Sequence, residues 1–240
     1  MRNGGCARPA TVLRLLRRRY PEARLEPADP FQTLIATVLS QRTREENTAI
    51  ASRRLFERFP DAHSLASAPV EEVERLIKPC GFYRMKANTI VRIARELVER
   101  HGGWVPRCRE ELLNLPGVGR KTANCVLVYA FGIPAIPVDT HVHRISNRLG
   151  WVRTITPEET ERELERLIPR NQWLDINELF VLFGRELCRP LGPRCAECPI
   201  RDCPSRGRLA EGRRRGRASA PGLAGTVLSK VGRLAGTGPR

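Results

Sequence analysis

Apolar residues recur at every third or fourth position along most of this 240-residue chain. In segment 85–103, for example, they form a single stripe, and Gly102 is placed to end the helix. Side chains three or four residues apart share one face of an α-helix, so this period predicts amphipathic helices. The same pattern predicts helices at 31–43, 47–59, 70–77, 108–115, 120–131, 140–150, 157–168 and 175–188. No alternating segment longer than four residues indicates a strand, and the chain is therefore predicted to be all-α.

Two prolines, Pro134 and Pro137, interrupt the helix that is predicted to begin near Arg120. Proline in a helix interior removes a hydrogen bond and clashes with the preceding turn, so a helical domain is expected to end here and a second one to begin. The expected division is 1–28 (an N-terminal helix packing with the second domain), 29–133 (a six-helix domain), 134–203 (a helical domain with a cysteine loop) and 204–240 (a basic, disordered tail).

The chain carries 42 lysines and arginines against 26 aspartates and glutamates, a formal net charge of +16. Such a surplus predicts an acidic polymer as partner, most simply nucleic acid. No segment reaches the roughly 18 apolar residues of a membrane-spanning helix, and the N-terminus lacks the apolar run of a secretion signal. We expect a cytoplasmic protein associated with the nucleoid, neither secreted nor bound to a membrane.

Residues 108–131 are predicted to form two helices joined by the turn Pro-Gly-Val-Gly. The two glycines permit positive φ and the close approach of another backbone. The second helix would offer its first N–H groups and the positive end of its dipole to a phosphate oxygen, without regard to base sequence. The alternative is an ordinary helical hairpin whose glycines serve packing alone. In a chain this basic we favour DNA binding, by Leu115, Gly117, Val118, Gly119 and Arg120.

Lys121 is expected in the first turn of the second helix, where the helix dipole disfavours a cation. A neutral lysine amine is a nucleophile that forms a Schiff base with a carbon at the aldehyde oxidation level. The alternative is a lysine that simply pairs with a phosphate. Asp139, 18 positions later, precedes another predicted helix and is expected to cap it. A carboxylate held there can stabilise positive charge at a sugar carbon or shuttle a proton.

Half of the eight cysteines lie within 16 residues, at Cys188, Cys195, Cys198 and Cys203. In a chain without an export signal, this crowding favours a metal site over disulfides. Four thiolates so close together suit a [4Fe–4S] cluster or zinc, and their spacing alone does not choose between the two.

Two segments, LPGVGRKTANCVL (115–127) and VDTHVHR (138–144), resemble the signature segments of the endonuclease III branch of the helix-hairpin-helix DNA glycosylase superfamily. LSQRTREENT (39–48) is similar to its early helix, and the resemblance spans about 31–203. It implies two helical domains, a helix-hairpin-helix glycosylase domain and a cluster-loop domain, with the DNA cleft between them. It also implies that Lys121 attacks C1′ of the damaged nucleotide and that Asp139 assists. Members with this lysine are bifunctional: they release an oxidised pyrimidine and then cleave the strand 3′ to the abasic site by β-elimination.

The resemblance assigns roles to further residues. Gln41 matches the family glutamine that fills the space left in the duplex when a nucleotide leaves the stack. His141 and Arg144 are expected either to orient the Asp139 loop or to meet a phosphate. Lys86 falls where the family has a similar lysine, but a solvated charge on a helix is its expected role here.

Because members of the family carry an iron–sulfur cluster on a cysteine loop of this kind, the resemblance favours [4Fe–4S] over zinc. This chain departs from the usual pattern, since four residues rather than five separate Cys198 from Cys203. The expected partner is double-stranded DNA containing damaged bases or abasic sites, and the protein is expected to be a monomer. Two alternatives stay open: a glycosylase for mismatched thymine or adenine or for an oxidised purine, and a non-catalytic iron–sulfur DNA-binding protein. Lys121 with Asp139 argues against the second alternative, because binding alone needs no such pair.

Overall fold

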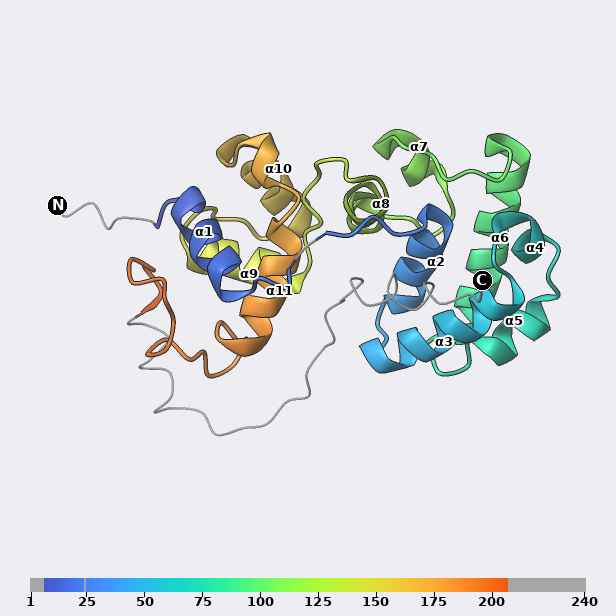
Figure 1. The fold of residues 1–240 in the computed structure, drawn as a ribbon, viewed down its shortest axis with the longest axis horizontal. Helices are drawn as coiled ribbons and strands as arrows, with labels where there is room; N and C mark the ends of the chain where they lie inside the picture. The colour runs from blue at the N-terminus through green and yellow to red at the C-terminus, as the bar shows by residue number, and fades with distance from the viewer. Residues whose placement is uncertain (1–6, 24, 207–240) are drawn as a thin grey trace, which may run out of the picture. The chain divides into compact units, whose positions relative to one another are not determined.

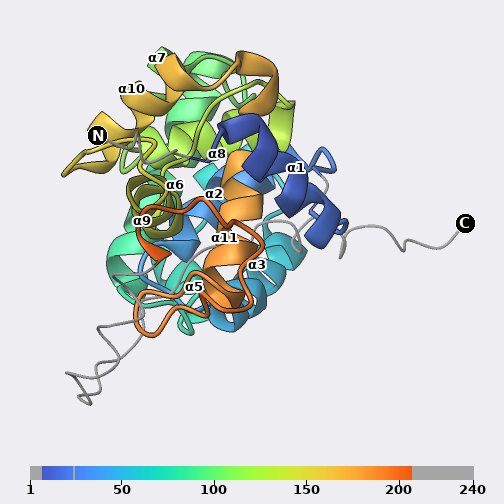
Figure 2. The ribbon, with the colours of Figure 1, turned by 90° about the vertical axis from the view of Figure 1, so that its left-hand side faces the viewer.

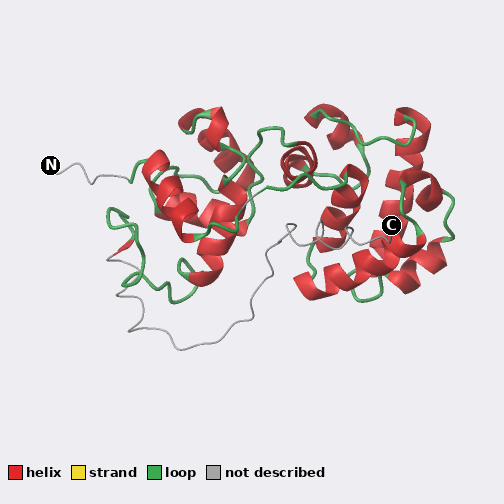
Figure 3. Cartoon of the chain, viewed as in Figure 1, coloured by secondary structure: helices red, strands yellow, loops and turns green. Residues whose placement is uncertain are grey.

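The structure is a computed structural model that describes residues 7–23 and 25–206. Within these residues every regular element is a helix, and loops join the helices (Figure 1, Figure 3). The prediction of an all-α fold is therefore confirmed for the described part of the chain. The elements are α1 (Pro9–Arg19), α2 (Pro30–Ser40), α3 (Glu45–Arg58), α4 (Ala62–Ala66), α5 (Val70–Leu76), α6 (Tyr83–His101), α7 (Arg109–Asn114), α8 (Arg120–Phe131), α9 (Thr140–Arg148), α10 (Pro157–Leu167), the 3-10 helix η1 (Arg170–Gln172) and α11 (Ile176–Glu186).

The described chain divides by its internal contacts into two compact units. One, here called the hairpin unit, is Leu25–Ala135 and contains α2 to α8. The other, the cysteine unit, combines residues 7–23 with 136–206 and contains α1 and α9 to α11. The domain limits expected at 28/29, 133/134 and 203/204 stay predictions, and the expected basic tail lies outside the described residues from 207 onward. None of the helices in 7–23 and 25–206 is long and apolar enough to cross a membrane.

Helix α8 ends at Phe131 because Gly132 adopts the left-handed conformation, with φ of 62°. The Gly132 N–H then donates to carbonyl oxygens of the last turn, as is common at a glycine C-cap. The expectation that Pro134 and Pro137 break this helix is therefore wrong, since the glycine has already ended it.

The apolar period did not predict the short helix α4. Five residues are too few to display a stripe. The helix begins with a capping box, in which the Asp61 carboxylate accepts from the Ser64 N–H at 2.8 Å and Ser64 Oγ accepts from the Asp61 N–H at 3.3 Å. Its start was therefore visible in the sequence only as a capping signal.

Two buried helices, α2 and α8, pack against each other in the hairpin unit. Figure 1 looks along α8 where it lies beside α2. Residues 33–39 of α2 and 122–130 of α8 are buried without interruption, as expected for helices in the interior of a unit. The longest helix, α6, packs against α2, α4 and α5. The end of α2 and the start of α8, where predicted site residues lie, are thus carried by core helices.

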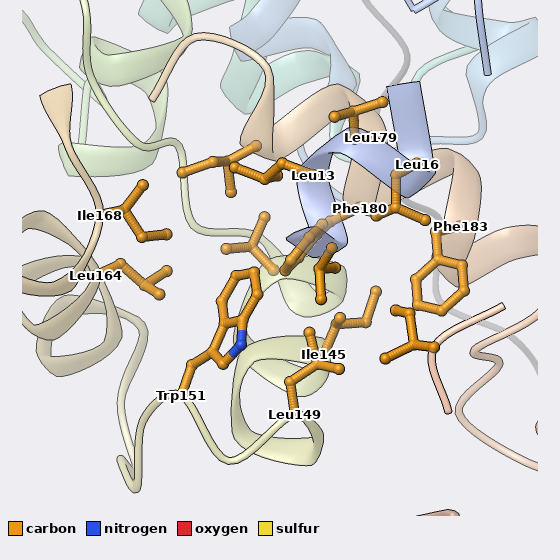
Figure 4. Close-up of a cluster of buried hydrophobic side chains, with 14 of the residues drawn as sticks. Leu13, Leu16, Ile145, Leu149, Trp151, Leu164, Ile168, Leu179, Phe180 and Phe183 are labelled. Carbon is orange, nitrogen blue, oxygen red and sulfur yellow. The ribbon is translucent and has the colours of Figure 1, made fainter. Parts of the chain in front are cut away.

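The cysteine unit closes around its own apolar core (Figure 4). The Trp151 and Phe180 rings lie 5.5 Å apart, and Trp151 Nε1 donates to the Ala7 carbonyl at 2.6 Å. The labelled residues of this core are Leu13, Leu16, Ile145, Leu149, Trp151, Leu164, Ile168, Leu179, Phe180 and Phe183. The core therefore joins the first described residues of the chain to helices that follow 130 or more positions later.

Helix α1 lies beside α11 in this unit (Figure 2). Arg17 pairs with Asp175, 158 positions later, and Tyr20 donates to Glu186 Oε2 at 2.6 Å. Exposed ion pairs each contribute little stability, so the buried apolar face of α1 supplies most of the attachment.

Candidate functional site

Two buried apolar side chains hold the turn between α7 and α8 against the hairpin unit. Leu115 and Val118 are buried, and the Val118 N–H donates to the Leu115 carbonyl at 3.2 Å. Gly117 has φ of +70°, and a Cβ added there would lie 2.8 Å from Thr89 Cγ2. Both the backbone conformation and the close contact with α6 therefore require glycine at position 117.

Gly119 differs from Gly117. It is the N-cap of α8 with extended backbone (φ −93°, ψ 176°), and a Cβ added there would meet no atom of the described residues within 4 Å. The expectation of positive φ is thus met at Gly117 and not at Gly119. The fold itself does not demand a glycine at position 119, but its absent side chain leaves open space in front of the first turn of α8.

Lys121 occupies the first turn of α8, one residue after the partly buried Arg120. The buried run of α8 begins directly after it, at Thr122. The Lys121 side chain is itself only partly buried. Core packing therefore fixes the backbone of this residue while its side chain keeps access to solvent.

Gln41 follows the last turn of α2 and is exposed. Its Nε2 donates to the Gly117 carbonyl at 3.4 Å and to Thr122 Oγ1 at 3.3 Å. The structure therefore brings Gln41 to the same turn as the residues of the predicted phosphate site, although 76 positions separate it from Gly117.

Asp139 is the N-cap of α9, as its position in the sequence suggests. Its Oδ1 accepts from the N–H groups of His141 and Val142, both at 2.8 Å. Its Oδ2 is buried and has no hydrogen-bond partner among the described residues. One oxygen thus holds the helix, while the other is oriented by that cap and remains available to another group. Asp139 belongs to the cysteine unit and Lys121 to the hairpin unit.

His141 and Arg144 form contacts inside the cysteine unit. His141 is buried, which lowers its pKa, so the neutral ring accepts from Arg144 Nη2 at Nδ1, at 3.1 Å. A Cβ on Gly184 of α11 would lie 2.2 Å from this nitrogen, so the ring packs closely on that helix. Arg144 also donates to the Cys188 carbonyl at 3.0 and 3.2 Å. These contacts support the alternative in which the two residues orient α9 and its cap.

The four clustered cysteines line one cavity of the cysteine unit, at Cys188, Cys195, Cys198 and Cys203. Burial raises the pKa of the Cys198 and Cys203 thiols, and the neighbouring cysteines raise it further. Four thiolates in such a place need a cationic centre to offset their charge, and soft sulfur donors fit a thiolate-binding metal group. Within 7–23 and 25–206, no three His, Cys, Asp or Glu side chains come together as ligands of one metal ion.

Sequence reasoning missed Arg148 at this cavity. Its Nη1 donates to Cys188 Sγ at 3.4 Å and to the Arg189 carbonyl at 2.6 Å, and its Nη2 donates to the Pro190 carbonyl at 2.8 Å. The side chain holds the cysteine loop to the last turn of α9. Nothing in the local sequence signals these bonds, because they depend on how the loop folds back on the helix.

Lys86 was also misjudged, because the expectation of a solvated helix charge is wrong. The side chain is buried in the hairpin unit, and Nζ donates to the Leu39 and Gln41 carbonyls and to Thr43 Oγ1. A signal was present in the sequence, since Lys86 lies four residues before Ile90 on the apolar stripe of α6. A lysine on a core-facing stripe indicates a buried, hydrogen-bonded cation.

A model of the HhH-GPD superfamily of base excision DNA repair proteins matches residues 35–170. Endonuclease III of Thermotoga maritima is 56% identical over 185 residues, which are 77% of this chain and 86% of that protein. A solved structure of a trapped covalent endonuclease III–DNA intermediate, in an estranged-adenine complex, superposes with a TM-score of 0.76 at 40% identity and covers 85% of this chain and 95% of the other. A thermostable thymine-DNA glycosylase superposes with a TM-score of 0.71 at 25% identity, over 83% of this chain and 96% of the other.

Proposed function

The chain belongs to the endonuclease III family of HhH-GPD base excision DNA repair proteins, and on that premise we propose that it is a bifunctional DNA glycosylase. It removes an oxidised pyrimidine from double-stranded DNA and then cleaves the strand 3′ to the abasic site by β-elimination. Cytoplasmic location with the nucleoid and a monomeric state stay predictions.

The open space at Gly119 is the observation that carries the proposal. Neither positive φ nor a neighbouring atom of the described residues takes up the space beside this glycine, so a group from outside the chain can approach the start of α8 there. A DNA phosphate fits, because a glycine N-cap exposes the positive end of the α8 dipole without an intervening side chain. A phosphate bound in this way brings the sugar–phosphate backbone to Lys121, two residues further on.

Lys121 is the proposed nucleophile. Its amine attacks C1′ of the damaged nucleotide, the base departs, and opening of the sugar ring gives a Schiff base between Nζ and C1′. Loss of a proton from C2′ then expels the 3′-phosphate and cleaves the strand. The nucleotide must leave the stack for this chemistry, at a cost of a few kcal/mol, which is lower for a damaged base. The trapped covalent complex of the related endonuclease III supports this assignment.

Asp139 is the proposed carboxylate that supports the reaction. The cap through Oδ1 fixes the orientation of its carboxyl group, while Oδ2 has no partner among the described residues. A preorientated negative oxygen stabilises positive charge as it develops on the sugar, and it can accept a proton from the amine.

Duplexes of one sequence test this function directly. They carry an oxidised pyrimidine, an oxidised purine, a mismatched thymine or adenine, or an abasic site. We expect release of the oxidised pyrimidine together with strand cleavage at neutral pH, and cleavage of the abasic duplex. Base release that leaves the strand intact would contradict the lyase activity, preferential release of another base would contradict the substrate class, and binding without release would make this a DNA-binding protein.

We also propose that Cys188, Cys195, Cys198 and Cys203 hold a [4Fe–4S] cluster. The cavity that they share and its all-sulfur donor set support this group, and Arg148 adds a hydrogen bond to Cys188 Sγ. When bound, the cluster supplies four iron–thiolate bonds that cross-link the loop. The interval between Cys198 and Cys203 is one residue shorter than usual. Both cysteines nevertheless pack against the core of the cysteine unit.

Metal analysis of two cysteine variants tests the cluster. The purified wild type is expected to contain about four iron and four sulfide per chain, and Cys198→Ser to lose most of both. Cys108→Ser is the matched control, because Cys108 lies in the hairpin unit with its Sγ 3.2 Å from Glu111 Oε2. Zinc in place of iron and sulfide, or full iron content in Cys198→Ser, would contradict the assignment.

A further inference from the structure

Lys86 is a buried cation for which the proposed chemistry gives no role. Its side chain is 3% exposed on the core-facing side of α6, where removal from water disfavours a charge. Its Nζ donates to the Leu39 carbonyl at 2.7 Å, the Gln41 carbonyl at 2.6 Å and Thr43 Oγ1 at 2.7 Å. Three acceptors match the three N–H donors of an ammonium group.

These three acceptors all belong to the turn that ends α2. Leu39 lies in the last turn of that helix and Gln41 is its C-cap, so the ammonium stands at the negative end of the helix dipole. The carbonyl groups at a helix end have no partners within the helix and need donors from elsewhere. Lys86 therefore fixes the backbone of 39–43 from the interior of the hairpin unit.

The turn that ends α2 and the residue that caps α6 both carry strained backbone. Arg42 (φ 50°) and Phe82 (φ 58°) are the two non-glycine residues with positive φ in 7–23 and 25–206. The Arg42 guanidinium lies 5.9 Å from the centroid of the Phe82 ring, and a Cβ on Gly81 would lie 3.0 Å from the Arg42 carbonyl oxygen. Such conformations persist only where surrounding contacts hold them.

Lys86 donates hydrogen bonds to Phe82 itself and to the residue before Arg42. Its backbone N–H donates to the Phe82 carbonyl at 3.0 Å, and its ammonium donates to the carbonyl that directly precedes Arg42. The exposed Gln41 side chain leaves this turn toward the Gly117 carbonyl and Thr122 Oγ1, beside Lys121 in sequence. The buried Lys86 side chain thus holds turn 39–43, from which the exposed Gln41 side chain reaches the hairpin.

We propose that Lys86 is a positioning residue that presets Gln41 for the duplex before DNA binds. The inference rests on the proposed function, and it adds a residue that acts through Gln41 rather than on the reacting atoms. Its contribution is needed where the duplex must be opened around the damaged nucleotide. It is not needed where the sugar is already accessible to Lys121, as in single-stranded abasic DNA.

The test compares Lys86→Met with Lys78→Met, an exposed lysine that serves as the matched control. We expect kcat/KM for base release from duplex to fall about 100-fold in Lys86→Met, since a shift of about 1 Å in a positioning group costs this much. Schiff-base trapping on single-stranded abasic DNA is expected to stay within about threefold of wild type, as is Lys78→Met on both substrates. Equal losses on both substrates, or none, would overturn the proposal.

A double-mutant cycle with Gln41→Ala shows whether Lys86 acts through Gln41. If it does, Lys86→Met adds little to the loss already caused by Gln41→Ala, whereas independent roles give additive losses and overturn the proposal. Thr43→Val removes a single acceptor of the ammonium and repeats the comparison if Lys86→Met does not fold. In Thr43→Val the fall in kcat/KM is expected to be smaller than in Lys86→Met, and it is again expected only with duplex DNA.

Hydrogen exchange separates this inference from the proposed function. Faster amide exchange in 39–43 is expected in Lys86→Met or Thr43→Val, while exchange in 122–130 stays unchanged. If wild type releases no base from any duplex, the proposed function fails and this readout still decides whether Lys86 holds the turn. Unchanged exchange in 39–43 would overturn the positioning role.

Discussion

Lys121→Gln is expected to abolish the covalent adduct that borohydride traps between this protein and an abasic-site duplex. Glutamine is similar in length but has no amine, so it cannot form the imine that borohydride reduces. Removal of a covalent nucleophile commonly costs a factor of about 1,000 or more in rate, and strand cleavage is expected to fall at least that far. Trapping is measured as a protein–DNA band that survives denaturing electrophoresis.

Lys78→Gln is the control for this experiment, because it removes an exposed lysine of the same unit. It is expected to trap DNA like the wild type. Binding of Lys121→Gln to undamaged duplex is expected to stay within about tenfold of wild type, since loss of one phosphate-attracting charge weakens binding only modestly. A strong adduct in Lys121→Gln would remove Lys121 from its role as nucleophile. Loss of binding together with the adduct would assign it to phosphate contact instead.

Asp139→Asn and Asp139→Ala are expected to separate the two roles of this side chain. Asparagine caps a helix about as well as aspartate, so the free energy of unfolding is expected to stay within about 0.5 kcal/mol in Asp139→Asn. Alanine gives up the bonds to the N–H groups of His141 and Val142 and is expected to lose about 0.5–2 kcal/mol. Base release is expected to fall about 100-fold or more in both variants, because both lack the carboxylate.

Denaturant unfolding and single-turnover base release, measured on the same preparations, check this pair. Near-normal base release by Asp139→Asn would mean that the carboxylate serves only as a cap. Equal destabilisation of the two variants would mean that the charge, rather than the cap geometry, holds the start of α9.

The helices could be predicted because their cause is local. The apolar period located most of them, and Gly102 ends α6 in the left-handed conformation as expected. The short α4 was missed because a stripe needs more turns than it has. The end of α8 was attributed to Pro134 and Pro137, although Gly132 precedes both and suffices. The first error missed a helix too short to show a stripe, and the second named the wrong residue as the end of a helix that was correctly predicted.

Parts of the candidate site were predictable for the same reason. Asp139 caps α9 through bonds to residues two and three positions away, and the Gly117 turn joins neighbouring helices. Lys86 was misjudged because its residue type was weighed above its place on the apolar stripe. The bonds of Arg148 to the cysteine loop span some 40 positions, and no local pattern encodes them.

The division of the chain into two units has a consequence for its folding during synthesis on the ribosome. The stretch Leu25–Ala135 is continuous, so its contacts can form as soon as it has emerged. Helix α1 emerges before this stretch, yet its partner α11 is translated after it, and until then the apolar face of α1 lacks that partner. Helix α1 is therefore translated before the hairpin unit but completes its native contacts only after that unit has been made.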